Sequence, residues 1–331
     1  MKQEIQKYLQ DPDANQKLPY GGKLSIVAKA VRFFCWLSMK TRTMWIVYPT
    51  AACGLTQLCR RSLFQRLFWK REVAIISEFL TQTRIGEKHD LQIVIQHSLM
   101  IKIWWHWWEE VLGKCYLTQF RQLVSVSGAS QFINIYQKRE GILLLFYHSE
   151  CRRLFQKYLN HCYFGRGVSI GRINELLRKK GQGENKFEKL LEKTRQYKRA
   201  KNELEAGGIV QILPDGMQGS RGIPKDFHAR KCNFQTGFAE LALDTGAHLI
   251  PVDVYSTMKG QLQIDYLKPL DKGSAKMNRQ QRIEIVVDQY VDYLHKCWQK
   301  QPWNTPVHTM EKHLNLPLVN PISGSGKNAK C

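Results

Sequence analysis

A histidine at the end of an apolar run is the first residue in the chain that could do chemistry. Residues 142–147 (ILLLFY) follow Gly141 and are uninterruptedly apolar, which predicts a fully buried strand. The run ends at His148, and a polar segment begins there. A side chain at the end of a buried strand lies at the edge of the sheet, where α/β enzymes place their chemistry. Imidazole is also well suited to take a proton near neutral pH. His148 is therefore either a general base or a strand-capping histidine.

The charge of the chain indicates an anionic partner. Fifty Lys and Arg stand against 28 Asp and Glu, a formal net charge of +22. Nucleic acid, anionic phospholipid headgroups and phosphate-bearing substrates all fit such a surplus. Nine Trp favour a membrane surface, because Trp prefers the lipid interface and cations bind acidic lipids. Nucleic acid ranks last, since no helix-turn-helix, zinc or RNA-binding signature is visible.

Cysteine and histidine spacing gives no sign of a metal or a cofactor. The nine Cys are scattered without a C-x-x-C pair, so we expect reduced thiols in a cytosolic compartment rather than a disulfide framework or a zinc site. No P-loop and no dinucleotide fingerprint is present. We expect no cofactor and no metal, and we interpret His228 and His248 as structural residues.

Three regions of different composition divide the chain. Residues 1–60 begin as a polar arm and become apolar from Leu24, with interspersed cations. The cleanest apolar run, 43–55, is shorter than the roughly 20 residues that span a bilayer. Val27, Val31 and residues 34–36, with cations on other faces, favour a membrane-associating helix that lies in the interface, although a buried packing helix fits that spacing equally well. Residues 61–317 are predicted to form the main domain, and 318–331, rich in Gly, Ser and Lys, a disordered tail.

The main domain is predicted to be α/β, with a central, mostly parallel sheet flanked by helices. A strand at 123–127, a helix at 130–138 and the His148 strand read as a βαβ unit, hence a parallel pair. Residues around 216–231, rich in Gly, Pro and cations, are expected to form a loop, and 261–267 an edge strand. Further buried strands are expected at 209–213 and 249–255, and further helices at 184–206, 236–244 and 279–299.

Four segments resemble the late acyltransferases of lipid A biosynthesis, a family of the lysophospholipid acyltransferase superfamily. They are VSVSGASQFINIYQKREGILLLFYHSE, LEAGGIVQILPDGMQGSRG, FQTGFAELALDTGAHLIPV and CWQKQPWNT. The resemblance implies the lysophospholipid or glycerol-phosphate acyltransferase fold. It also implies transfer of a fatty acyl group from acyl carrier protein or acyl-CoA to a hydroxyl or amine of a lipid or glycolipid. The place implied is the cytoplasmic face of the bacterial inner membrane, bound peripherally to an anionic lipid surface.

The resemblance assigns His148 as the general base but leaves its acidic partner open. The family pattern has Asp or Glu five positions after the His, and here that position is Arg153. Arg cannot accept the imidazole N–H. Glu150 could substitute from a different backbone path, or Asp215, at the end of a second strand, could orient the ring. The third alternative is that the dyad is lost, which would leave a catalytically silent lipid-binding member of the same fold.

Four arginines are candidates for substrate binding. Arg166 and Arg172 align with a stretch of the family that carries basic residues near the acyl acceptor, and Arg221 follows the PDG turn, where it could face a phosphate. Arg153 is included because it lies beside the predicted site. The planar guanidinium suits bidentate anion binding, although an exposed salt bridge is the ordinary role of such residues.

Overall fold

The computed structural model describes residues 70–98, 101, 124–152, 154–155, 167–169, 186–215, 222–257 and 261–319. The predicted membrane-associating segment at 1–60 lies outside the described residues, as does nearly all of the predicted tail. Within the described ranges, no helix combines the length and the apolar character needed to cross a bilayer.

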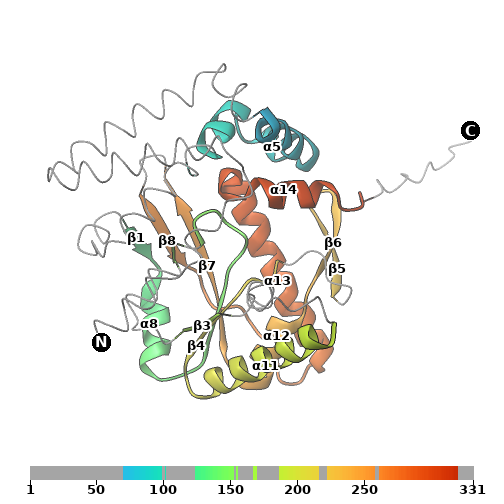
Figure 1. Ribbon diagram of the computed structural model, residues 1–331. Coiled ribbons are helices and arrows are strands. Elements are labelled where there is room, and N and C mark those ends of the chain that lie inside the picture. Colours follow the sequence, from blue (N-terminus) through green and yellow to red (C-terminus); the bar gives the residue numbers. More distant parts are fainter. Residues whose placement is uncertain are drawn as a thin grey trace, which may run out of the picture.

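A six-stranded mixed sheet forms the centre of the molecule (Figure 1). Four strands at its middle and one edge run parallel, β8 runs antiparallel to β7, and β1 runs parallel to β8. This confirms the α/β class and the mostly parallel sheet. The strands, in spatial order, are β1 (Val124–Ser127), β8 (Leu262–Tyr266), β7 (His248–Ser256), β2 (Ile142–Leu145), β4 (Ile209–Ile212) and β3 (Gly167–Ser169).

The predicted βαβ unit at the start of the domain is wrong. Helix α8 (Ala129–Gln137) follows β1, but β1 pairs with β8 and is separated from β2 by two strands. The residues of β1 alternate between apolar and polar, and three of its four side chains are exposed. Such a strand suits the edge of a sheet, whereas β2 is buried throughout. Strand β8, predicted to be an edge, is internal because it pairs on both sides.

Three helices in the second half of the domain confirm their predictions. They are α11 (Lys186–Glu205), α12 (Gly237–Thr245) and α13 (Arg279–Lys300). Helix α11 ends before Gly207, whose φ of 76° is the left-handed conformation typical of a glycine C-cap. Helix α13 begins at a capping box, in which Asn278 accepts from the Gln281 N–H and Gln281 accepts in return. Its buried stripe includes Tyr290, Tyr293 and Trp298, and it lies between the sheet and a hairpin (Figure 1).

That hairpin corrects the prediction of a loop at 216–231. Strands β5 (Ile223–Phe227) and β6 (Arg230–Phe234) pair antiparallel across a turn at His228 and Ala229, whose φ angles are 45° and 61°. Two left-handed residues match the turn type that suits the twist of a hairpin. Alternate side chains, including Phe227 and Phe234, are buried. Pro224 and the charged residues within both strands obscured this alternation in the sequence.

The remaining elements close the top of the sheet. Helix α5 packs on α14, with a 2.7 Å bond between Arg71 and Glu311 at their contact. The short helix η3 lies between α13 and α14 and brings Asn304 beside the chain that follows β2. Their bounds are α5 (Lys70–Thr83), η2 (Ile85–Glu87), η3 (Pro302–Asn304) and α14 (Val307–Leu314).

Candidate active site

Two parallel strands bring His148 and Asp215 together. Strands β2 and β4 pair in the register that sets Leu145 opposite Ile212. Each of the two polar residues lies three positions beyond its member of that pair, so both come to the carboxyl edge of the sheet. The Asp215 Oδ1 lies 2.7 Å from the His148 Nδ1, and the His148 backbone N–H donates to Oδ2 at 2.5 Å. One carboxylate therefore holds both the ring and the backbone of the histidine.

The burial of the two partners differs, and this decides the chemistry they can do. The Asp215 side chain is fully buried, whereas the His148 side chain is 42% exposed. A carboxylate only accepts hydrogen bonds, so the Nδ1 of His148 must carry the proton of the bond between them. The Nε2 is then the basic nitrogen, on a ring that solvent or substrate can reach. A fixed tautomer of this kind is what a general base requires.

The backbone just before His148 is also held. Tyr290, on α13, donates its hydroxyl to the Phe146 carbonyl at 2.9 Å. Burial, followed by the negative charge of Asp215, raises the pKa of Tyr290 well above its usual range. The hydroxyl therefore remains protonated and continues to donate. Phe146 itself extends the β2–β4 pairing, since its N–H donates to the Ile212 carbonyl at 3.0 Å.

Glu150 lies in the turn after His148, where its backbone N–H donates to the Asn304 carbonyl at 2.9 Å. Glu150 was one of the residues that could orient the His148 ring. In the structure, the Nδ1 of that ring is bonded to Asp215. The four predicted substrate-binding arginines, Arg153, Arg166, Arg172 and Arg221, lie outside the described residues.

A thiolate nucleophile is not available beside the histidine. Cys151 is buried, and burial raises the pKa of its thiol far above the usual range. It therefore stays a thiol near neutral pH. In the described ranges, no cluster of three His, Cys, Asp or Glu side chains is arranged to hold a metal ion. His148, with its accessible Nε2, is the candidate proton acceptor of this turn.

A second histidine–carboxylate pair lies at the opposite edge of the sheet. His248 is the first residue of β7, opposite Ile142 at the start of β2, and its Nε2 lies 2.7 Å from the Glu140 Oε2. His148 lies six positions after Ile142, along β2 and its extended continuation, so the two pairs are about 20 Å apart. The His248–Glu140 pair has the same chemistry as the His148–Asp215 pair but lies far from it. It therefore serves as a control for substitutions at His148 and Asp215.

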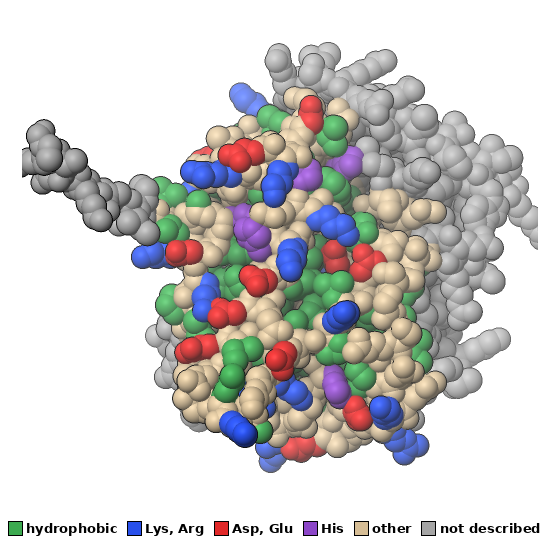
Figure 2. Space-filling view, turned by 180° about the vertical axis from the view of Figure 1, so that it is seen from behind, with side chains coloured by type: hydrophobic (Ala, Val, Ile, Leu, Met, Phe, Trp, Pro, Cys, Tyr) green, Lys and Arg blue, Asp and Glu red, His purple; other side chains and the backbone are tan. Residues whose placement is uncertain are grey.

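Positive charge is unevenly distributed along the chain. The described residues hold 25 of the 50 Lys and Arg but 21 of the 28 Asp and Glu. Their surface is accordingly mixed, with both signs interspersed over the face shown in Figure 2. Most of the surplus of +22 belongs to the remaining segments of the sequence.

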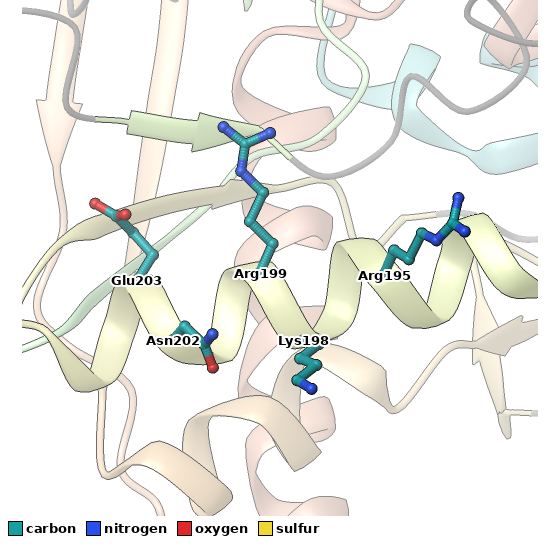
Figure 3. Close-up of a pocket in the computed structure, with 5 residues that line it drawn as sticks. All are labelled: Arg195, Lys198, Arg199, Asn202 and Glu203. Carbon is teal, nitrogen blue, oxygen red and sulfur yellow. The ribbon is translucent and has the colours of Figure 1, made fainter.

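Helix α11 carries the densest group of cations in the described sequence, with seven Lys and Arg against four Glu. Part of its surface is a hollow of about 410 Å³. In Figure 3, Arg195 and Arg199 rise from one side of the helix, with Glu203 beyond them, and Lys198 and Asn202 project from the other side. The hollow is open and is lined by three cations, one carboxylate and one amide.

The comparison with known families agrees with the geometry. A carboxylate-held histidine at the carboxyl edge of an α/β sheet is an arrangement that can serve general acid–base chemistry. The sequence model described as bacterial lipid A biosynthesis acyltransferase matches residues 100–298, more than half of the chain. The chain belongs to this family and is an acyltransferase, which confirms the resemblance. The matched span includes His148 and Asp215. No curated protein matches the chain.

Sequence reasoning missed the buried polar residues behind the histidine, namely Tyr147, Asp253 and Asn304. All three are at most 4% exposed and are joined by hydrogen bonds. Asp253 could have been recognised, because a lone carboxylate within the apolar run LIPVDVY must find a buried donor. The donor itself could not, since Tyr147 is 106 positions away.

Proposed function

We propose that this acyltransferase moves a fatty acyl chain from an acyl thioester to a hydroxyl or amine of a lipid or glycolipid, with His148 as the general base and Asp215 as its partner. The donor is acyl carrier protein or acyl-CoA. The observation that carries the proposal is the double contact of the Asp215 carboxylate with the ring and the backbone N–H of His148. Asp215 takes the place of the acidic residue that the family pattern has at the position of Arg153.

The chemistry follows from the orientation of the ring. A hydroxyl is a poor nucleophile at neutral pH, so a base must take its proton as the oxygen attacks the thioester carbonyl. The Nε2 of His148 accepts that proton while Nδ1–H remains on Asp215, whose charge stabilises the imidazolium that forms. The tetrahedral intermediate then collapses, the carbon–sulfur bond breaks, and the proton passes from Nε2 to the thiolate that leaves. Each proton is accounted for without a metal.

The remaining parts of the proposal concern the residues that bind the substrates and the location of the protein in the cell. Arg166, Arg172 and Arg221, with Arg153, are proposed to bind the anionic groups of donor and acceptor, because guanidinium binds phosphate and carboxylate bidentately. The protein is proposed to lie peripherally on the cytoplasmic face of the bacterial inner membrane. The cationic surplus outside the described residues supports this place, since anionic headgroups attract such segments.

Thioester cleavage by the purified chain tests the proposal. Long-chain acyl-CoA and acyl carrier protein thioesters are supplied separately with a membrane lipid extract, and thiol release is followed. We expect His148→Ala to lower the lipid-dependent rate by roughly two to four orders of magnitude. Asp215→Asn is expected to lower it by at least roughly a hundredfold, because the amide no longer fixes the tautomer.

Two variants make the test specific. Glu140→Gln disrupts the pair with His248 at the far edge of the sheet and is expected to leave the rate within about twofold. Glu150→Gln is also expected to retain activity. Loss of activity in Glu150→Gln, with Asp215→Asn unaffected, would instead identify Glu150 as the partner. If the unmodified chain binds liposomes but releases no thiol with either donor, the silent lipid-binding function replaces the acyltransferase.

A further inference from the structure

The turn that carries His148 is held on the side away from Asp215 by a second set of residues. Two groups of this turn are bonded to other elements there. The Glu150 N–H donates to the Asn304 carbonyl at 2.9 Å, and the Ser149 hydroxyl lies 3.4 Å from the Val254 carbonyl on β7. The turn therefore has two supports, the Asp215 carboxylate beyond the end of β4 and a polar group assembled from η3 and β7.

Asn304 is the centre of this second support. Its side chain is fully buried, and its Nδ2 donates both hydrogens, to the Tyr147 hydroxyl at 2.8 Å and to the Val254 carbonyl at 2.7 Å. With the bond from Glu150 to its backbone carbonyl, it contacts residues on both sides of His148. An amide that uses both donors in this way fixes the spacing of the groups that it joins.

Tyr147, the residue just before His148, continues the network inward. Its hydroxyl donates to the Asp253 Oδ1 at 2.9 Å, and Gln301 approaches the other carboxylate oxygen at 3.5 Å. The chain of bonds thus runs from Asn304 through the tyrosine hydroxyl to a buried carboxylate, with each group donating to the next. Such a chain has one preferred geometry, because reversing any bond would leave a buried donor without an acceptor.

We propose that Asn304 and Tyr147 are positioning residues for the transfer reaction, which set the place of His148 relative to the bound substrates. This inference rests on the proposed role of His148. The ring is 42% exposed, so its place depends on its backbone and on Asp215 rather than on close packing around it. Displacement of a reacting group by about 1 Å can cost roughly a hundredfold in rate.

Tyr147→Phe is the sharpest change, because it removes one oxygen and keeps the buried ring. Asn304 then loses the acceptor of one hydrogen, and Asp253 loses its closest donor. Buried polar groups left without partners are costly, so the turn relaxes towards other partners. We expect kcat to fall by about 10- to 100-fold, while KM for the thioester and for the lipid each stay within about threefold.

Tyr293→Phe is the matched control. Tyr293 is also buried, and its hydroxyl donates to the Val252 carbonyl on the same strand, β7, at 2.9 Å. The same chemical change is therefore made two residues from Val254, at a hydroxyl whose hydrogen bond goes to β7 and not to the turn. We expect the kcat and both KM values of Tyr293→Phe to match those of the unmodified chain. Its thermal stability is expected to fall, because the Val252 carbonyl loses its donor.

A spectroscopic measurement separates positioning from activity. The Nδ1–H proton of His148 is followed by NMR in ¹⁵N-labelled protein and assigned by its absence in His148→Gln. We expect this resonance to broaden or shift in Tyr147→Phe and in Asn304→Ala, because the bond to Asp215 loosens. We expect it to be unchanged in Tyr293→Phe.

The outcomes are distinct. Equal kcat and an equal Nδ1–H resonance in Tyr147→Phe and Tyr293→Phe would overturn the positioning role, as would a change confined to KM. If the unmodified chain transfers no acyl group while Tyr147→Phe still alters the resonance, the positioning of His148 stands and the proposed function fails. A lower kcat together with an altered resonance supports both.

Discussion

Asp215 contacts His148 at two points, and this makes it more than an orienting partner for the ring. By accepting the backbone N–H as well, the carboxylate ties the ring position to the position of the chain. A carboxylate on the same turn as the histidine would move with it. A carboxylate on a neighbouring strand keeps the imidazole in place against the sheet. The arginine at position 153 is therefore compatible with an active site whose acid comes from another strand.

A second buried carboxylate, Asp253, makes a prediction about stability. Burial is the main reason that its pKa is raised from 3.8 to about 6. Between those values the folded protein holds a proton that the unfolded chain has lost, so the free energy of unfolding falls as pH rises through this window. Asp253→Asn removes that loss. We expect the variant to gain roughly 1–3 kcal/mol relative to the unmodified chain between pH 4 and pH 7.5, measured by urea unfolding.

The amide is expected to fit because Gln301 can rotate its own amide by 180° and offer Oε1, which is buried without a partner in the structure. Asp244 is the control of opposite sign, because a hydrogen bond from Arg279 lowers its pKa. The deficit of Asp244→Asn is expected at pH 7.5 and should shrink as pH falls. A stability difference for Asp253→Asn that does not change with pH would show that Asp253 does not titrate in this window.

Residue chemistry could be predicted from the sequence only where the pattern was local. His148 was found because an apolar run ends at it, and Asp215 because a second run ends there. The contact of Asp215 with His148 depends on the register of β2 and β4, which sequence spacing does not contain. Asn304 could not be found in this way, since its partners come from a strand and a turn more than 45 residues away.

At the scale of elements, helix α13 is hydrogen-bonded to the central sheet and to the chain that leads to His148. Tyr290 and Tyr293 donate to the carbonyls of Phe146 and Val252, so the helix is bonded both to the extension of β2 and to β7. Its first turn is stabilised by the capping box of Asn278 and Gln281. Through Tyr290, the helix therefore couples the stability of the fold to the position of the chain that leads from β2 to His148.

Asn278→Ala tests how much the cap contributes. The first-turn N–H groups lose their side-chain acceptor, so we expect the free energy of unfolding to fall by about 1 kcal/mol, measured by urea unfolding. Asn278→Gly, which retains the cap conformation, should cost only a few tenths of a kcal/mol. The contact of Tyr290 with the chain before His148 lies about three turns further along, so kcat is expected to be unchanged. Equal losses in both variants would mean that the cap hydrogen bond contributes little.

Element types were easier to predict than element partners. The buried runs of β2, β4 and β7 and the stripe of α13 have strong periodicity, and all were predicted close to their observed bounds. The partner of β1 was not, because alternation predicts a strand without saying what lies beside it. The β5–β6 hairpin was missed because Gly222, Pro224 and several cations, which usually mark loops, precede its first strand or lie within its strands.

For the whole molecule, the division of charge predicts where an anionic membrane is bound. Residues 1–69 alone contain eleven Lys and Arg against three Asp and Glu, whereas the described residues are almost balanced. Substitution of Arg60, Arg61 and Arg66 by Gln is expected to weaken binding to vesicles that contain anionic phospholipid. Each cation near such a surface contributes about 1 kcal/mol, so the loss is up to roughly a hundredfold. Sedimentation with anionic and zwitterionic vesicles measures it.

The matched control removes the same charge from α11, by substituting Gln for Arg195, Lys198 and Arg199. We expect this variant to bind anionic vesicles within about threefold of the unmodified chain. Weaker binding in the α11 variant alone would move the membrane-facing surface to that helix. Equal binding by the unmodified chain and both variants would exclude both groups of cations as the attachment to the membrane.

The distance along the chain between His148 and Asp215 has a consequence for how the protein acquires activity. The partners are 67 residues apart and meet only when β2 and β4 have paired in the correct register. Contacts of such separation form slowly, because the intervening chain must lose its freedom before the pairing is rewarded. A strand shifted by one residue would turn one partner to the other face of the sheet. Under the proposed mechanism, the appearance of catalysis during refolding reports the completion of the central sheet, and a partly folded chain with its helices formed is inactive.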